Sequence, residues 1–390
     1  MENFVSQLPT KIIFGRGMEN IVGDEVARYS RKALLHFGGS SAEKSGLLGR
    51  VRASLKKAGV DWVELGGVRP NPVVSLVRKG VALCRAEDVG VILAVGGGSV
   101  IDSAKAIAIG FHYQGDVWDF YAGAAPNPEK ALPIGTVLTI PAAGSESSAG
   151  SVVTNEDGAL KRAVNADCII PRFSVLNPEL AFSLPANQVA NGVADIMAHL
   201  MERYFTNVTN VEFSDRLIEA TLRTVIAAGP RVLADKNDYD AWAEVMWAGS
   251  IAHNNLLDRG RIGDWASHDI EHELSGIYDI AHGAGLAVIF PAWMKYNLAH
   301  DLPRFAQFAV RVWGVEPDYL DQEAVAREGI ARLEAFRKSL GLAVRLSGLN
   351  IGTERASEMA RKCTDGDRHT TGQFVKLTSV DIEKIYRLAE

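Results

Sequence analysis

Residues 91–98 read VILAVGGG, so a short apolar run ends directly on three glycines. Apolar runs of this length bounded by glycine are typical of buried parallel strands. Similar runs occur at 33–37, 61–65 and 133–140. Helical segments lie between them at 47–58 and 73–86. This alternation predicts a parallel sheet whose strands are joined by right-handed helical crossovers.

The pattern changes after about Pro185, where strand-like runs give way to helical periodicity. Pro178 and Pro185 mark the passage between the two patterns. A chain of 390 residues is also long for a single core. We therefore expect two domains, an α/β domain at 1–180 and an all-helical domain at 181–390.

The overall composition excludes several classes of protein. The formal net charge is -6 and no basic run stands out, so a nucleic-acid partner is not expected. Cys84, Cys168 and Cys363 are far apart, which disfavours a disulfide framework or a cysteine metal cluster. Neither a signal peptide nor a membrane-spanning helix is expected, and the cytoplasm is the expected location.

The turn after residues 91–95 suits a phosphate group. Its glycines, including Gly97 and Gly98, let the backbone approach a ligand and adopt positive φ. The helix that follows offers unpaired N–H groups. Ser99 and Asp102 have the spacing of a capping box, which gives them a structural reading as well. A tight turn without any ligand is the alternative.

A second turn follows the run at 33–37 and contains Gly38, Gly39 and Ser41, with Lys44 nearby. It lacks the acidic residue that would bind a ribose hydroxyl and repel a 2′-phosphate. The turn therefore favours NADP over NAD, although an ordinary left-handed turn would have the same composition.

Two segments of the second half carry metal-ligand types. Asp195 and His199 are four residues apart, which places them on one face of a helix. His268 and His272 repeat this spacing, and His282 follows a turn expected at Gly276. Such nitrogen and oxygen donors suit Fe²⁺, Zn²⁺, Mn²⁺ or Co²⁺ rather than Ca²⁺. A buried Asp–His hydrogen bond and solvated helix histidines are the alternatives. The remaining histidines, taken as structural or surface residues, are His36, His112, His253, His300 and His369.

Five segments together resemble the iron-containing (group III) alcohol dehydrogenase family over nearly the whole chain. They are GGGSVIDSAKAIA at 96–108, TIPAAGSESSAGSVVTN at 139–155, NPELAFSLP at 177–185, NGVADIMAHLMERY at 191–204 and HDIEHELSGIYDIAHGAGLAVIFP at 268–291. The third is similar to the family's interdomain strand. The tip at Gly39 resembles the butanol dehydrogenase and aldehyde reductase branch, which usually uses NADPH, and so do ANGVADIMAH at 190–199 and DWASHDIEHELS at 264–275.

The resemblance implies roles for individual residues. The implied metal ligands are Asp195, His199, His268 and His282, with Fe²⁺ the expected ion and Zn²⁺ also fitting. The implied cofactor residues are Gly38, Gly39, Ser41, Gly97, Gly98, Ser99, Asp102, Thr139, Ser145 and Lys161. For the lysine, Arg162 is an alternative in register. His272 corresponds to a histidine near the metal and is a candidate proton relay.

The resemblance further implies a dehydroquinate synthase-like fold, an active site between the two domains, and a homodimer paired partly through a strand at 4–14. The implied reaction is reversible, metal-dependent hydride transfer between NADP(H) and an alcohol or aldehyde, with a primary alcohol or aldehyde as substrate. Glycerol-type dehydrogenases, a dehydroquinate synthase-like lyase and a non-enzymatic nucleotide-binding protein are the alternatives. The lyase would need several basic residues to grip phosphate, whereas only Arg203, Arg259 and Arg261 lie near the metal segments.

Overall fold

The computed structural model describes all residues from 1 to 390, and the chain divides into two compact units. One unit comprises Gln7–Ser183, and the other comprises Met1–Ser6 together with Leu184–Glu390. The division thus falls three residues after the boundary expected at 180/181, and the first six residues belong with the second half of the chain. No helix is both long and apolar enough to cross a membrane.

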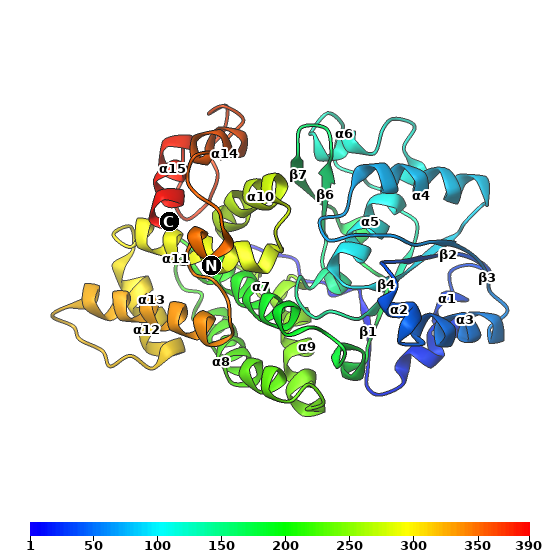
Figure 1. Cartoon of the computed structure of the whole chain (residues 1–390), viewed down its shortest axis with the longest axis horizontal. Coiled ribbons are helices and arrows are strands. Elements are labelled where there is room, and N and C mark those ends of the chain that lie inside the picture. Colours follow the sequence, from blue (N-terminus) through cyan, green and yellow to red (C-terminus); the bar gives the residue numbers. More distant parts are fainter. The chain divides into compact units, whose positions relative to one another are not determined.

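The first unit is built on a six-stranded sheet in which every strand pairs in parallel with its neighbours. In spatial order the strands are β1 (Lys11–Phe14), β8 (Phe173–Leu176), β5 (Ile134–Leu138), β4 (Val91–Gly96), β2 (Lys32–Phe37) and β3 (Asp61–Leu65). The helices of this unit are α1 (Val22–Val26), α2 (Ser41–Lys44), α3 (Leu47–Lys57), α4 (Val74–Ala86), α5 (Gly98–His112) and α6 (Trp118–Tyr121). Short 3₁₀ turns lie at Met18–Ile21, Ser145–Ser147, Asp167–Ile169 and Pro178–Ala181. Figure 1 shows α4 in blue and α5 in cyan beside the strands of this unit.

Alternate residues along the strands face opposite sides of the sheet. In β2 and β4, Leu35, Val91 and Leu93 pack into one apolar core with side chains from α1 and α3. His36, which directly follows Leu35 in β2, faces the other side of the sheet, where its Nε2 lies 2.9 Å from Oγ of Ser103 on α5. The period of two along each strand therefore produces helices on both faces of the sheet, as the alternation of elements predicted.

Three details of this unit differ from expectation. The strand at the N-terminus covers Lys11–Phe14 only, rather than 4–14. The prediction of a strand at 177–185 is wrong, because Pro178–Ala181 forms a 3₁₀ turn and the strand lies just before it, at β8. An antiparallel hairpin, β6 (Gly150–Asn155) and β7 (Leu160–Asn165), was not predicted.

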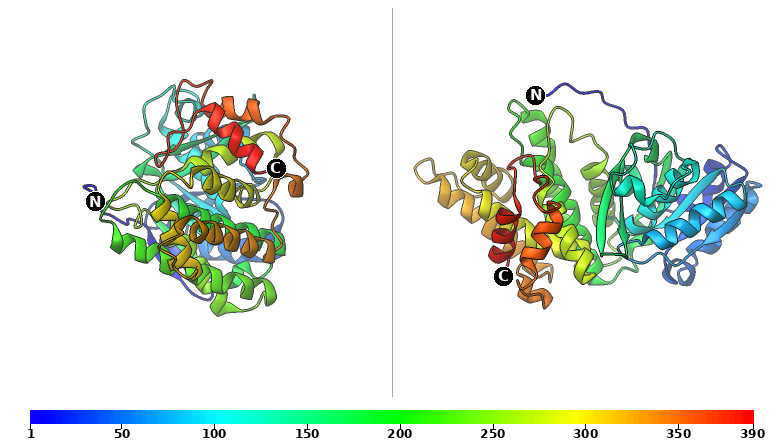
Figure 2. Two further views of the ribbon diagram at one scale, coloured as in Figure 1. Left: turned by 90° about the vertical axis from the view of Figure 1, so that its left-hand side faces the viewer. Right: turned by 90° about the horizontal axis from the view of Figure 1, so that it is seen from above.

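The second unit is helical, and the α/β-plus-helical fold class is confirmed. Its helices are α7 (Ala186–Tyr204), α8 (Glu212–Ala234), α9 (Tyr239–His253), α10 (Ala266–Tyr278), α11 (His282–Asn297), α12 (Leu302–Trp313), α13 (Gln322–Ser339), α14 (Ala356–Cys363) and α15 (Ser379–Leu388), with a 3₁₀ turn at Leu346–Leu349. Figure 2 shows α7 and α8 in green and the pair α12 and α13 in yellow and orange. Phe205, Trp293, Phe305 and Phe374 form an aromatic core in this unit.

Candidate metal and nucleotide sites

Several of the predicted nucleotide residues lie at the carboxyl ends of the central strands of the sheet. Gly38 and Gly39 follow the carboxyl end of β2, Gly97 and Gly98 follow β4, and Thr139 follows β5. These strands are adjacent, and the chain order reverses between β2 and β4, because β3 lies outside β2 while β5 lies beyond β4. The carboxyl ends of strands at such a reversal are where parallel sheets bind nucleotides.

The glycines after β4 owe their identity to close packing rather than to positive φ. An added Cβ would lie 2.9 Å from Cβ of Ile140 at Gly97, and 2.9 Å from Cβ of Ala143 at Gly98. Neither glycine has positive φ, so that part of the prediction is wrong. The turn is narrow because the 139–145 loop lies directly against it, and the N–H of Thr139 donates to the carbonyl of Gly96 at 3.0 Å.

Asp102 binds a neighbouring loop instead of forming a capping box with Ser99. The N-cap of α5 is Gly97, and it has no side-chain hydrogen bond. The Asp102 carboxylate accepts from Oγ of Ser145 at 2.5 Å and from the N–H of Val152 at 3.0 Å. Burial, only partly opposed by Lys105, raises the pKa of this carboxyl group. Asp102 therefore joins the helix that follows the β4 turn to the 145–152 segment that follows β5.

Lys105, one turn further along α5, fastens the same loop. Its side chain is fully buried and donates to the carbonyls of Ser148 at 2.9 Å and Gly150 at 2.7 Å. Burial lowers its pKa to about 8. Lys161 lies on β7, where it pairs with Thr154 of β6 and is buried, whereas Arg162 is half-buried. The two candidate residues for the cofactor lysine thus face opposite sides of the hairpin.

In the second unit, three of the four predicted metal ligands converge. Asp195 on α7, His268 on α10 and His282 at the start of α11 place one donor atom each within 4.8 Å of one another. The fourth, His199, lies one turn beyond Asp195, with its Nδ1 3.6 Å from Oδ1 of Asp195. Its ring centroid is 4.8 Å from that of His268.

Two nitrogens in this cluster are suited to a cation. Nδ1 of His199 and Nε2 of His268 are buried and have no hydrogen-bond partner in the protein. Burial lowers the pKa of His268 to about 4 and that of His199 well below its ordinary value, so both rings are neutral near pH 7. Buried nitrogens normally have partners, and neutral imidazole lone pairs are metal ligands. The donor set therefore fits a divalent ion.

His272 lies close to His282, and the turn that precedes His282 comes later in the chain than expected. The His272 ring centroid lies 5.5 Å from that of His282, and Glu271, His272 and His282 form a second group of close donor atoms. Gly276 lies inside α10, so the turn expected there is wrong. The turn begins instead at Asp279, whose φ is 51°.

Sequence reasoning missed three residues next to the cluster. Oε1 of Glu202 lies 2.7 Å from Nδ1 of His268, and Oε2 of Glu271 contacts Nδ1 of His282. Both glutamates are fully buried. His253 was taken as a structural or surface residue, but its ring centroid lies 4.3 Å from that of His199. Each glutamate follows a predicted ligand by three residues in an apolar helix, and this spacing was the available signal.

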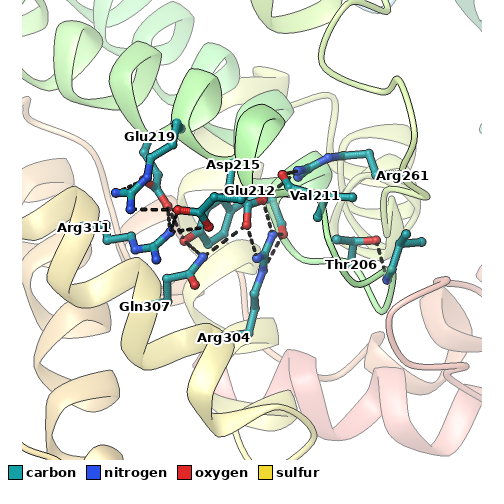
Figure 3. A network of polar contacts seen from close by, with 12 residues as sticks. Thr206, Val211, Glu212, Asp215, Glu219, Arg261, Arg304, Gln307 and Arg311 are labelled. Atoms are coloured by element: carbon teal, nitrogen blue, oxygen red, sulfur yellow. Dashed lines mark hydrogen bonds and ion pairs between the residues drawn. The ribbon is translucent and has the colours of Figure 1, made fainter. Parts of the chain in front are cut away.

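Two of the three basic residues near the metal segments are engaged in ion pairs, whereas the buried Nε of Arg259 has no hydrogen-bond partner. Arg203 is buried and binds Asp258 at 2.9 Å, and Arg261 binds Asp215 at 2.6 Å. Figure 3 shows Asp215 between Arg261 and Arg304, with a neighbouring cluster around Glu219. Arg203 and Arg261, which are already paired inside the protein, are therefore poor candidates for binding a phosphorylated substrate.

A parallel sheet with glycine turns at its switch point is typical of nucleotide-binding enzymes, and the Asp–His cluster of the helical unit fits a divalent metal ion. Comparison with known proteins gives the family. Residues 9–178 match the model described as iron-containing alcohol dehydrogenase, and residues 189–389 match the C-terminal model of the Fe-containing alcohol dehydrogenase family. The chain belongs to the iron-containing alcohol dehydrogenase family and is an oxidoreductase.

Relatives place the chain within that family. It is 43% identical to the probable NADH-dependent butanol dehydrogenase 1 of Bacillus subtilis, with 99% of each chain covered. It is 34% identical to the NADPH-dependent aldehyde reductase YqhD of Escherichia coli, with 100% of each covered. A crystal structure of NADH-dependent butanol dehydrogenase A from Thermotoga maritima matches with a TM-score of 0.96 and 40% identity, covering 100% of this chain and 99% of the other. The butanol dehydrogenase and aldehyde reductase branch is thereby confirmed.

Proposed function

We propose that this enzyme interconverts a primary alcohol and its aldehyde with NADP(H), at a site where Asp195, His199, His268 and His282 hold a divalent metal ion. The observation that carries the proposal is the pair of buried, unpartnered nitrogens, Nδ1 of His199 and Nε2 of His268, beside the Asp195 carboxylate. An apolar core would not leave two neutral imidazoles facing one carboxylate without a further ligand.

The residues of the chain would then have separate roles in the proposed reaction. A bound divalent ion supplies Lewis-acid polarisation of the alcohol or aldehyde oxygen, and the nicotinamide supplies or accepts the hydride. Burial keeps the ligand imidazoles neutral and so preserves their lone pairs. His272, mostly buried beside His282, would hold or release the proton that the substrate oxygen exchanges. The proposed nucleotide residues belong to one unit and the proposed metal ligands to the other.

The ion that we propose is Fe²⁺, with Zn²⁺ as the second candidate. One carboxylate oxygen and three imidazole nitrogens are donors that both ions accept. The family's description as iron-containing supports Fe²⁺.

The proposed preference for NADP(H) rests on the turn after β2. Gly39 has no side chain to repel a 2′-phosphate, an added Cβ there would meet nothing within 4 Å, and Lys44 lies in the adjoining helix α2. The relatives differ in this respect, since the Bacillus protein is named NADH-dependent and the Escherichia protein NADPH-dependent. A kcat/KM that is much higher with NADH than with NADPH would overturn the preference.

We also propose a homodimer that pairs through the N-terminal strand. β1 is an edge strand, paired within the chain only with β8. An open strand edge is a ready surface for pairing with a second copy. Light scattering should give twice the mass of one chain, and a monomer at micromolar concentration would contradict this proposal.

The central experiment combines metal analysis with turnover. The purified enzyme should contain about one Fe²⁺ or Zn²⁺ per chain and consume NADPH with simple aldehydes. His268→Ala should lose both metal and turnover, whereas His112→Ala, a change at an exposed histidine of the other unit, should lose neither. A His268→Ala protein that is metal-free yet fully active would refute the metal role.

A further inference from the structure

The carboxylate of Glu202 links α7 and α10, the two helices that carry three of the proposed metal ligands. Glu202 lies on α7, three residues after His199, and is fully buried. Its Oε2 accepts from the N–H of Trp265 at 2.7 Å, and its Oε1 accepts from the N–H of His268 at 3.1 Å. The same Oε1 lies 2.7 Å from Nδ1 of the His268 ring. Both carboxylate oxygens are therefore directed at the beginning of α10.

The beginning of α10 is only partly capped by the chain next to it, because Oδ2 of Asp264 accepts from the N–H of Ala266 at 3.3 Å. Its N-cap residue, Trp265, makes no side-chain cap hydrogen bond and has a φ of 69°, a left-handed conformation that bulky residues rarely adopt. Glu202 supplies further acceptors from another helix. The residue before the N-cap also contacts Glu202, since the N–H of Asp264 donates to the backbone carbonyl of Glu202 at 2.9 Å.

We propose that Glu202 is a positioning residue of the metal site, an inference that rests on the proposed function. Asp195 and His199 precede Glu202 on α7, and His268 is held directly by its carboxylate. One side chain thus sets the distance between the ligands of α7 and the ligand of α10. It also fixes the orientation of the His268 ring, because Nδ1–H directed at Glu202 leaves the Nε2 lone pair facing Asp195 and His199.

The chemistry of the side chain predicts which replacements fail. A glutamine has one oxygen and one NH₂ group, whereas all three groups that meet Glu202 are donors. Glu202→Gln would therefore set a donor against a donor at one end of its amide. Glu202→Asp keeps both carboxyl oxygens but shortens the reach by one methylene.

The test measures metal affinity directly, by titrating metal-free full-length enzyme with Co²⁺ against a competing chelator. The matched control is Glu219→Gln, which alters an equally buried glutamate on α8 whose partners are Tyr204 and Arg311. We expect Glu202→Gln to weaken the Kd for Co²⁺ by about 10- to 100-fold and to shift the visible Co²⁺ absorption bands. Glu219→Gln should lower the melting temperature of the metal-free protein and leave both the Kd and the bands unchanged.

The outcomes separate this inference from the proposed function. Wild-type affinity and bands in folded Glu202→Gln, while His268→Ala binds no Co²⁺, would overturn the positioning role alone. If the wild type itself binds no Co²⁺ stoichiometrically, the metal site fails and the positioning role fails with it. Should Glu202→Gln not fold, Glu202→Asp takes its place. We then expect an intermediate Kd that is weaker than wild type, and an unchanged Kd would overturn the role.

Discussion

Gly283 of α11 lies so close to Asn191 of α7 that an added Cβ would be 2.1 Å from the Asn191 carbonyl oxygen. Real Cβ atoms do not approach backbone oxygen so closely, so only glycine permits this approach of the two helices. Asn191 lies one turn before Asp195, and Gly283 directly follows His282. The backbone contact therefore brings two of the proposed ligands together.

The first prediction concerns Gly283→Ala. The methyl group should push α11 away from α7, displace His282, and destabilise the protein by about 1–3 kcal/mol through overpacking. We expect metal affinity to fall at least about tenfold, measured by chelator competition. Gly49→Ala is the matched control, because Gly49 also lies in a helix but its added Cβ meets nothing within 4 Å. Equal metal affinities of the two variants would contradict the proposed constraint.

The second prediction concerns the nucleotide. Gly39→Asp should place a carboxylate at the turn after β2, where it would repel a 2′-phosphate and bind a ribose hydroxyl. The ratio of kcat/KM for NADPH to that for NADH should fall at least about tenfold, the scale of one charge interaction of about 1.4 kcal/mol. Gly39→Asn, which adds similar bulk without charge, should change the ratio much less. An unchanged ratio in the aspartate variant would place the adenosine end elsewhere.

The third prediction follows from the neutral histidine in the sheet. Burial lowers the pKa of His36 to about 4, although a hydrogen bond to the carbonyl of Leu65 opposes this. The unfolded chain, with an ordinary histidine pKa of about 6.5, binds the proton first. Stability attributable to His36 is thus present above pH 6.5 and is lost as the pH falls towards 4, by about 3 kcal/mol in all.

Urea denaturation of metal-free protein at several pH values tests this. Between pH 6.5 and 4, wild type should lose more stability than His36→Gln, because glutamine does not titrate. The exposed His112→Gln serves as the control for histidine replacement and should follow the wild-type slope. Parallel slopes for wild type and His36→Gln would show that His36 is protonated as readily in the folded protein as in the unfolded chain.

The fourth prediction concerns the buried ion pairs of Figure 3. Asp215→Asn leaves the guanidinium groups of Arg261 and Arg304 without the carboxylate that lies 2.6 Å from one and 2.5 Å from the other. Removing one partner of a buried pair typically costs about 3–5 kcal/mol. Asp365→Asn, at an exposed pair with Arg368, should cost less than about 1 kcal/mol. Similar urea midpoints for the two variants would contradict a structural role of Asp215.

Much of the sheet was predictable because its central strands β2, β4 and β5 are largely apolar and buried on both faces. The runs expected at 33–37, 61–65 and 91–95 match β2, β3 and β4 to within one residue. The hairpin was not visible in the sequence, since its strands GSVVTN and LKRAVN mix polar and apolar residues without a clear period. β8 has only four residues, too few to distinguish from the segment that follows it.

The site was predictable for residues that carry a chemical signature and less so for those that support them. Asp195, His268 and His282 converge as the motif implied. Glu202 and Glu271 resemble solvated helix glutamates in the sequence, and only packing reveals that they are buried against imidazoles. His253 stands alone at the end of α9, and its place beside His199 depends on how three helices pack.

All four proposed metal ligands and their two supporting glutamates lie between residues 195 and 282, within a single unit, whereas the proposed nucleotide residues lie between 38 and 161 in the other. Substitutions that change the coenzyme preference therefore need not alter any residue of the proposed metal site. Such a separation would let evolution, or a protein engineer, change the coenzyme preference of the enzyme without altering the proposed metal site.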